Sequence, residues 1–515
     1  MEEKRIKKLR PIIFYIFLFL FILAFGTIAK DYDYDFWARL IAGMGFVQTG
    51  HVLKQDFLSY TPTHTWFDHE WGSGVIFYLT QHFFSASGIL ILQAVLVFLM
   101  FFTITKVIKL RGGKTTDAYN FLFYYFAYII LSYILNSPIR CQIFSFLFFT
   151  AFLYLMERER KGVNKGWELI ILPPLLMIIW NNLHGGCVSG IGLIVIYIIG
   201  EFLNRKPVRK YIYALIGAIV VLPVNPWGFS YLEFLFKANT MQRTDIVEWW
   251  GLFSGFFMFK YIKFKLYALI LFSLELGLII KQIKDKTFNF DKTKFLVLGV
   301  TLFLAIQHVK LIPFAVISMM CFLYDDFYTV FNGITKNFFN KIAVFKDTII
   351  YLIILFFVVF NLKVEAFQPL ISKSRYPIFA VEFVRANDIK GNLLISFGLG
   401  SYASYKLYPN NKIFMDGRYE EVYYDDLVPM MNKFYTLKPG WDELLKKYPP
   451  DVMIIEKFYS IFYALVKNKD WDYVYDDNYF GVFVKHQDRK KIYKKPETNQ
   501  EYYKKTLFDT KIKFF

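Results

Sequence analysis

The chain has 515 residues, of which 56% are hydrophobic and 21% aromatic, and its formal net charge is +18. Soluble globular proteins average about 45–50% apolar residues, so this composition excludes an ordinary soluble protein. The charge does not indicate nucleic-acid binding, because Lys and Arg gather in short segments between apolar runs, as in membrane proteins. The three cysteines have no metal-ligand spacing and predict no disulfide framework.

The first apolar run, residues 11–29, carries no charge and is long enough to cross ~30 Å of hydrocarbon as a helix. It lacks a convincing small-residue cleavage site, so we predict an anchor and not a cleaved signal peptide. Ten further apolar runs bring the prediction to about eleven transmembrane helices. These runs lie at 87–107, 118–135, 142–156, 167–181, 187–203, 211–224, 264–281, 294–309, 311–324 and 347–365.

The distribution of Lys and Arg predicts the orientation of these helices. The segment before residue 11 is strongly basic, and every second connection after it carries most of the remaining Lys and Arg. The positive-inside rule therefore places the N-terminus in the cytoplasm and the region after residue 365 outside. The expected organisation is a transmembrane domain at 1–365 with a first outer loop at 30–86, an extracytoplasmic α/β domain at 366–485, and a Lys-rich tail at 486–515 that is solvated or attracted to anionic headgroups.

The first outer loop is expected to contain two helices that lie in the membrane interface. Hydrophobic residues at helical spacing predict the first of them, and Gly50 is suited to end it. The second is expected to begin at Asp68, acting as N-cap, and to run through Trp71. The residues that define the first helix are Phe36, Leu40, Gly43 and Val47.

The same loop holds the densest cluster of chemically unusual residues in the chain. Asp33 and Asp35 follow the first apolar run, and Asp68, His69 and Glu70 lie further along. One interpretation is a solvated end to the membrane helix. The other is a general base that takes a proton from an acceptor hydroxyl during sugar transfer. A divalent cation such as Mg²⁺ or Mn²⁺, held by Asp33, Asp35, Asp68 and His69, is a further alternative.

The other polar residues that are candidates for a functional role fall in predicted outer segments. The predicted inner loops contain only scattered Lys and Arg among residues without a distinctive pattern, so we expect the functional face outside. Arg140, at an outer membrane edge, is either a snorkelling anchor or a ligand for a lipid phosphate. His184 precedes two glycines between two predicted spans and either hydrogen-bonds within the turn or faces a cavity. Glu248 and Trp249 are suited to hydrogen-bond and stack on a sugar ring. The segment 225–228 (Asn-Pro-Trp-Gly) predicts a turn.

The region after residue 365 alternates between helical and strand-like patterns, which predicts a small α/β domain. The helix-like runs lie at 376–385 and 441–447, the strand-like runs at 392–397, 412–415 and 451–455, and a hairpin-like run at 473–484. Within it, Asp416, Gly417 and Arg418 follow a strand-like run. Asp416 and Arg418 either pair beneath a turn at Gly417 or face a cavity at the membrane, and both alternatives are open at this stage.

Several short strings together resemble those of the GT-C glycosyltransferases, the superfamily that includes protein O-mannosyltransferases and the lipid A aminoarabinose transferase. More narrowly, they resemble a group of prokaryotic GT-C-like membrane proteins, over about residues 31 to 425. Ala38 and Arg39 depart from the narrower group, which often has Trp and His there. The strings begin at Asp33 (D-x-D-F-W), Asp56 (D-F-x-S-Y-T), Trp66 (W-x-D-H-E-W), Asn182 (N-x-H-G), Asn225 (N-P-x-G), Glu248 (E-W) and Asp416 (D-G-R-Y).

The resemblance implies a mainly α transmembrane GT-C-like fold and a catalytic or metal-binding role for the first-loop acid, which falls on Asp35 or Asp33. It also implies phosphate contact near His308 and Lys310, since a basic residue recurs there in the narrower group. His69 and Glu70 are further candidates for substrate binding. A prokaryotic cell membrane is the location that the resemblance implies.

We therefore expect a membrane glycosyltransferase that moves a sugar from a polyprenyl-phosphate-linked donor to an extracytoplasmic protein, lipid or glycan. No redox cofactor, nucleotide cofactor or nucleic-acid partner is expected. Two other classes are alternatives. A lipid or saccharide transporter or flippase is disfavoured, because such proteins often have internal repeats and buried charges along their helices, whereas the polar residues here lie at one face. A non-catalytic scaffold for cell-envelope assembly is the second.

Overall fold

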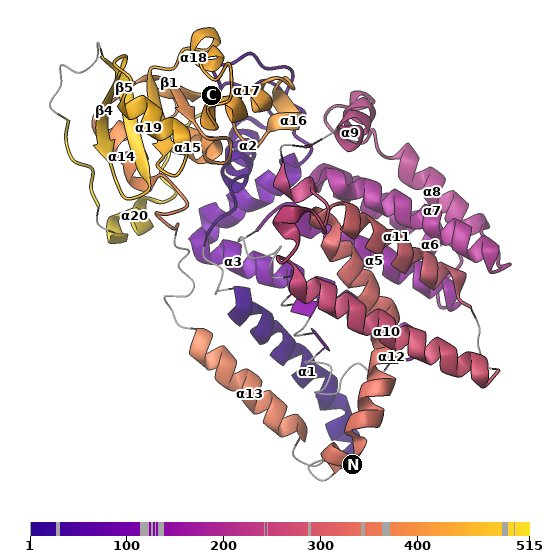
Figure 1. Ribbon diagram of the computed structural model, residues 1–515. Helices are drawn as coiled ribbons and strands as arrows, with labels where there is room; N and C mark the ends of the chain where they lie inside the picture. The colour runs from indigo at the N-terminus through magenta and orange to yellow at the C-terminus, as the bar shows by residue number, and fades with distance from the viewer. Residues whose placement is uncertain are drawn as a thin grey trace. The chain divides into compact units, whose positions relative to one another are not determined.

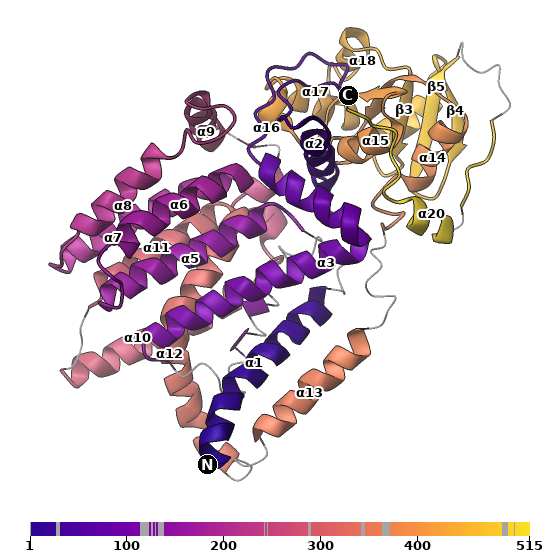
Figure 2. The same cartoon turned by 180° about the vertical axis from the view of Figure 1, so that it is seen from behind.

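A computed structural model describes residues 2–26, 31–113, 123–124, 127–128, 130–131, 139–241, 243–244, 246–286, 290–340, 346–362, 371–486, 493–498 and 500–514. The described chain is mostly helical and has a small sheet near its C-terminal end (Figures 1 and 2). It divides into two compact units. The helical unit comprises residues 1–29 and 90–367, and the α/β unit comprises residues 30–89 and 368–515.

The helical unit consists of long apolar helices. Each predicted apolar run coincides with a helix except 118–135, most of which lies outside the described residues. Five helical segments of the described chain are long and apolar enough to cross a membrane: Leu9–Gly26, Trp71–Leu110, Gly185–Leu203, Ile262–Lys284 and Val309–Thr329. The helices are α1 (Glu2–Gly26), α3 (Trp71–Leu110), α5 (Gln142–Arg160), α6 (Glu168–Leu183), α7 (Val188–Leu203), α8 (Arg209–Val220), α9 (Ser230–Thr240), α10 (Ile262–Lys284), α11 (Lys292–Gln307), α12 (Ile312–Asn340) and α13 (Lys346–Asn361).

Helix α3 is broken at Ser85, where the backbone has a φ of 55° and a ψ of −156°. The break separates the helix predicted in the first outer loop from the apolar run at 87–107. It also lies close to the boundary between the two units at residues 89 and 90. The single helix therefore contributes its first part to the α/β unit and its second part to the helical unit.

Glycines let neighbouring helices of the helical unit approach closely. A Cβ on Gly200 of α7 would lie 2.7 Å from the Cα of Thr293 on α11, and one on Gly190 would lie 2.6 Å from the ring of Trp180 on α6. Small residues at such crossings allow the dense packing that holds apolar helices together within a membrane.

Segments predicted to lie on the same side of the membrane contact one another in this unit. On the predicted inner side, Arg160 lies 2.8 Å from Glu201 and 2.7 Å from Asp291, and Arg111 lies 2.9 Å from Glu157. Glu157 is fully buried. These charges form an ionic network that links the ends of α3, α5, α7 and α11. The expectation that the inner loops contain only scattered Lys and Arg was therefore wrong.

The α/β unit is built on a five-stranded sheet with the order β2-β1-β3-β5-β4. Strands β2, β1 and β3 are parallel, and β5 and β4 form an antiparallel hairpin against β3. All of the strand-like runs found in the sequence coincide with these strands. The strands are β1 (Gly391–Ile395), β2 (Asn411–Ile413), β3 (Val452–Glu456), β4 (Trp471–Asp476) and β5 (Phe480–Lys485).

Alternate residues of the central strands pack on opposite faces of the sheet. Leu394, Met453 and Phe483 belong to a core shared with one group of helices. That group is α17 (Leu427–Tyr435), α18 (Glu443–Lys447) and α19 (Ser460–Val466), whereas α14 (Ile378–Ala386) and α15 (Gly400–Leu407) contact other parts of the sheet. The sequence predicted α14 and α18 but not α15, α17 or α19.

The first outer loop packs as part of the α/β unit. Ser59 forms a parallel bridge with Ile413 of β2, and the N–H of Tyr60 donates to the carbonyl of Ile413 at 3.0 Å. Because β2 is the edge strand, this segment satisfies backbone groups that an open edge would leave exposed. The loop and the C-terminal region, more than 300 residues apart in sequence, therefore share one core.

Helix α2 (Phe36–Thr49) is the first helix predicted for this loop, and Gly50 ends it with a φ of 74°. Its residues 36–45 are all buried. Gly43 and Gly74 bring α2 and α3 into backbone contact, since a Cβ on Gly74 would lie 2.6 Å from the carbonyl oxygen of Arg39. The helix is thus enclosed by protein along most of its length, which corrects the expectation of an amphipathic helix on the membrane surface.

The end of the chain also packs within this unit. Lys406 of α15 donates to the carbonyls of Thr506, Leu507 and Asp509 at 2.7, 3.2 and 3.0 Å. Phe508 contacts the ring of Trp37, with 5.9 Å between centroids. The last residues described are therefore held by specific contacts, contrary to the expectation of a fully solvated or headgroup-bound tail.

Candidate functional site

The acidic stretch after the first apolar run is anchored by backbone hydrogen bonds. Asp31 accepts a bond of 2.6 Å from the N–H of Ser372, and the buried Asp33 accepts one of 3.1 Å from the N–H of Asp35. Asp35 is half-buried, and its carboxylate lies directly against Gly417, since a Cβ on that glycine would meet a carboxylate oxygen of Asp35. Both catalytic candidates therefore belong to the α/β unit, with Asp35 the more accessible of the two.

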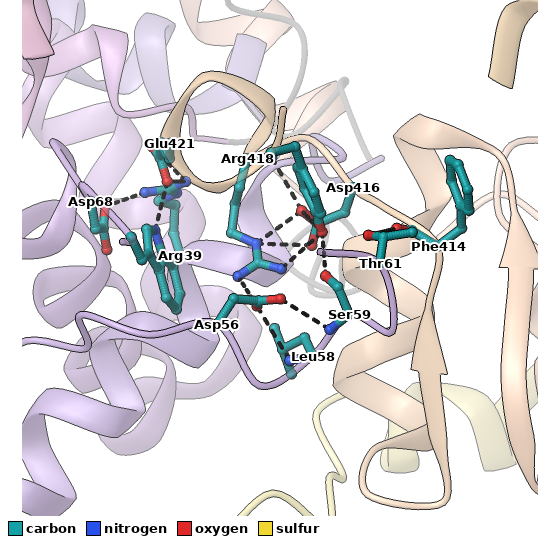
Figure 3. Close-up of polar contacts among 12 residues, drawn as sticks. Arg39, Asp56, Leu58, Ser59, Thr61, Asp68, Phe414, Asp416, Arg418 and Glu421 are labelled. Atoms are coloured by element: carbon teal, nitrogen blue, oxygen red, sulfur yellow. Dashed lines mark hydrogen bonds and ion pairs between the residues drawn. The ribbon is translucent and has the colours of Figure 1, made fainter. Parts of the chain in front are cut away.

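Arg39, noted in the sequence only as a departure, is the centre of a buried ionic network (Figure 3). Its guanidinium is ion-paired with Asp68, lies 2.9 Å from Glu421 and lies 3.3 Å from Glu70. Glu421 also accepts a bond of 2.9 Å from the indole N–H of Trp66. The W-x-D-H-E-W string is therefore joined to α16 (Tyr419–Val422) through Arg39.

His69 completes this network, with its Nδ1 at 3.0 Å from Glu421. Burial alone would lower the pKa of His69, but Glu421 and then Glu70 raise it to about 9. Burial would raise the pKa of Glu421, but Arg39 and His69 hold it well below its usual range. Burial raises the pKa of Asp68 to about 6 against the opposing charge of Arg39. The group is thus a set of mutually dependent charges.

A second buried network surrounds Arg418 (Figure 3). Its Nε donates to Asp416 at 2.9 Å, its Nη1 donates to Asp56 at 2.7 Å, and its guanidinium lies 4.6 Å above the ring of Trp66. Asp56 also accepts from the N–H groups of Leu58 and Ser59. Of the two interpretations of the D-G-R-Y string, the structure therefore has the ion pair beneath the turn.

One group of potential metal ligands converges in the described part of the chain. Ligand atoms of His69, Glu70 and Glu421 lie within 4.8 Å of one another, and the group does not include Asp33 or Asp35. Arg39 already contacts both of these carboxylates. A metal ion would have to displace its guanidinium, so these residues fit an internal ionic network better than a cation site.

The helical unit contains a different cluster, formed by three segments distant in sequence. Arg140 pairs with Glu248 at 2.6 Å. Lys310 and Arg243 lie 5.1 Å and 4.5 Å from the centre of the Trp249 ring. His308 supports this arrangement, because its Nδ1 lies 2.6 Å from the carbonyl oxygen of Trp249. Five residues singled out separately in the sequence are thus neighbours, and Arg243 joins them. We call these six residues the basic–aromatic cluster.

The charges of this cluster are unbalanced. Burial would raise the pKa of Glu248, but Arg140, Lys310 and Lys260 lower it, so several cations act on one carboxylate. The side chains of Arg140 and Glu248 are 21% and 43% exposed. Such a group can bind an anion, because guanidinium and ammonium groups are the usual partners of phosphate oxygens.

His184 has a local role. Its Nδ1 accepts from the N–H of Gly186 at 2.9 Å and lies 2.7 Å from the hydroxyl of Ser145, which also accepts from the indole of Trp180. These contacts are those expected if His184 hydrogen-bonds within the turn, which is the first of the two alternatives predicted for it. The predicted turn at 225–228 is also present, with the N–H of Trp227 donating to Asn225.

Sequence reasoning missed the partners that hold these sites together. Glu421 lies 382 residues from Arg39, and no local spacing relates them. Arg243 gave no signal beyond its charge. Comparison with known proteins adds no further identification, because no protein-family model and no curated protein sequence matches the chain.

Proposed function

We propose that the protein is a multi-pass membrane glycosyltransferase of the GT-C kind, with about eleven transmembrane helices and a cytoplasmic N-terminus. It would transfer a sugar from a polyprenyl-phosphate-linked donor to an extracytoplasmic acceptor. The observation that carries the proposal is the convergence of Arg140, Arg243 and Lys310 around Glu248 and Trp249. This combination of cations and an indole suits a phosphate joined to a sugar.

The chemistry follows from the groups present. The acceptor hydroxyl attacks the anomeric carbon of the sugar, the bond from that carbon to the phosphate oxygen breaks, and polyprenyl phosphate leaves with the electron pair. Arg140 and Lys310 stabilise the negative charge that develops on the leaving phosphate. Trp249 offers an aromatic face to the sugar. The acceptor's proton passes to a carboxylate.

Asp35 is the preferred base. Asp33 is buried and accepts a backbone hydrogen bond, whereas Asp35 is half-buried and lies against a glycine. A carboxylate that receives a proton from a substrate must be reachable by it. Asp35 meets this condition better than Asp33.

The test is sugar transfer by the purified protein in lipid nanodiscs. Polyprenyl phosphates carrying different tritiated monosaccharides are supplied as donors, with membranes of the producing organism as the source of acceptor. We expect one donor to be used and Asp35→Asn to abolish transfer, while Asp425→Asn, at an exposed position, transfers normally.

Two results would overturn the proposal. The first is that no donor loses its sugar, including the case in which the intact lipid is moved across the bilayer, as a flippase would do. The second is that Asp35→Asn and Asp33→Asn both transfer at the rate of the unaltered protein, which would remove the assigned base.

A further inference from the structure

The carboxyl ends of β1 and β3 are a second place where a ligand is expected. From β1 the chain continues to β2 on one side, and it later returns to β3 on the other side of β1. In open parallel sheets, ligands bind at the carboxyl ends of the strands where the connections diverge in this way. Ser396 directly follows β1 there, and Glu456 is the last residue of β3.

Glu456 is a buried carboxyl group, and one of its oxygens has no hydrogen-bond partner among the described residues. Its side chain is held by a bond of 2.5 Å from the hydroxyl of Ser396 to Oε1, whereas Oε2 has no hydrogen-bond partner among the described residues. The residue is only 6% exposed, and burial raises its pKa to about 7. A buried polar atom without a partner is destabilising, so a ligand hydroxyl that donates to it would remove this penalty.

Tyr435 and Tyr459 lie near this carboxyl group, since its charge contributes to the raised pKa of both. Tyr459 packs on Tyr435 with 4.7 Å between ring centroids, and Phe458, 76% exposed, lies 4.3 Å from Tyr459. The buried hydroxyl of Tyr435 also has no hydrogen-bond partner within the described chain. Burial, Glu456 and Tyr34 together raise the pKa of Tyr459 to about 12, as expected of close neighbours.

The first outer loop reaches the same edge of the sheet. A Cβ on Gly398, in the turn after β1, would lie 3.2 Å from the ring of Tyr34. Asp35 lies against Gly417, in the turn after β2. The preferred base and the surroundings of Glu456 therefore lie on neighbouring turns of one unit.

We propose that this edge binds a saccharide ring, with Glu456 and Tyr435 hydrogen-bonding its hydroxyls and Tyr459, Phe458 and Tyr34 packing on its apolar face. Binding sites commonly combine aromatic walls with a few convergent polar groups, and a pyranose ring presents both kinds of surface. That the bound saccharide is the acceptor rests on the proposed function, whereas the binding itself does not.

The test measures binding without catalysis. Saturation-transfer NMR with the full-length protein in nanodiscs is carried out with glucose, galactose, mannose and N-acetylglucosamine. We expect at least one of them to bind, and Glu456→Gln and Tyr459→Ala each to weaken it about tenfold, the loss of one good interaction. Glu443→Gln, at an exposed position of α18, is the matched control and is expected to bind normally.

Failure of all four sugars to bind would overturn the inference, as would binding that survives in Glu456→Gln and Tyr459→Ala. If Glu456→Gln does not fold, Tyr459→Ala at the half-buried rim decides the matter alone. Binding that depends on Glu456 in a protein that transfers no sugar would refute the transferase proposal and leave this site standing, so the two failures are distinguishable.

Discussion

Arg418 in the α/β unit and Arg140 in the helical unit both pair with carboxylates, but their surroundings differ. The side chain of Arg418 is 0% exposed and contacts Asp56 and Asp416, which are also buried. Arg140 and Glu248 are 21% and 43% exposed. Burial makes the first pair a fixed part of the core, since separating buried charges costs several kcal/mol. The second pair can exchange its carboxylate for a ligand at small cost.

The same difference in burial separates two groups of charged residues that were singled out in the sequence. Asp56, Asp416 and Arg418 are conspicuous in sequence yet fully occupied with one another. Arg140 and Lys310 lie in connections between apolar helices and retain exposed surface. We infer that the first group stabilises the α/β unit and that the second acts on substrate. The following predictions test this division.

The largest effect is expected for Arg418→Ala. The substitution leaves two buried carboxylates without their cation, which costs about 3–5 kcal/mol and is expected to unfold the α/β unit. Limited proteolysis and thermal unfolding of the purified protein measure this. The control is Arg385→Ala, which removes a partly exposed pair within α14 and is expected to cost less than about 1 kcal/mol. Equal stability of the two variants would contradict the buried role.

The network around Arg39 is expected to lose stability as the pH rises. Folding raises the pKa of His69 from its ordinary value near 6.5 to about 9, so protonated His69 stabilises the fold fully below pH 6.5 and less as the pH passes 9. The loss amounts to at most about 3 kcal/mol. Unfolding temperatures at pH 6.5 and 9.5 measure it.

In His69→Gln this pH dependence is expected to diminish, whereas in His51→Gln, at an exposed position, it is expected to persist. A His69→Gln protein with the full pH dependence of the unaltered chain would show that another group is responsible.

Arg140→Ala is expected to impair function and leave the fold intact. Loss of a charged hydrogen-bond donor to phosphate costs about 1.5–3 kcal/mol, which corresponds to roughly a 10- to 100-fold fall in kcat/KM for the donor. Arg209→Ala, which removes an exposed cation packed on Tyr213, is the control. A fall in unfolding temperature like that of Arg418→Ala would place Arg140 among the stabilising residues instead.

The smallest effect is expected for Glu248→Gln. The amide keeps the shape of the side chain but removes the charge that competes with a phosphate for Arg140 and Lys310. We expect a polyprenyl phosphate to bind about threefold tighter, a change of less than about 1 kcal/mol. Weaker binding would show that Glu248 contributes to the ligand site and does not compete with the ligand.

The helices of the helical unit other than α9 and the strands of the sheet could be predicted from the sequence, because apolar runs and alternation are local signals. The residues of the basic–aromatic cluster were also recognisable, apart from Arg243, since polar residues at the ends of apolar helices are unusual. The partnership of Arg39 with Glu421 could not be predicted, because a pair separated by 382 residues leaves no local pattern. Glu456 escaped notice for a related reason, since it ends an ordinary buried strand.

The central claim is that the basic–aromatic cluster binds the phosphate of a polyprenyl lipid, and the most direct measurement is the affinity of the purified protein for farnesyl phosphate. The unaltered chain and Arg209→Ala are expected to bind it equally, and Arg140→Ala at least tenfold more weakly. Absence of binding to the unaltered chain, or equal binding by Arg140→Ala, would contradict the claim.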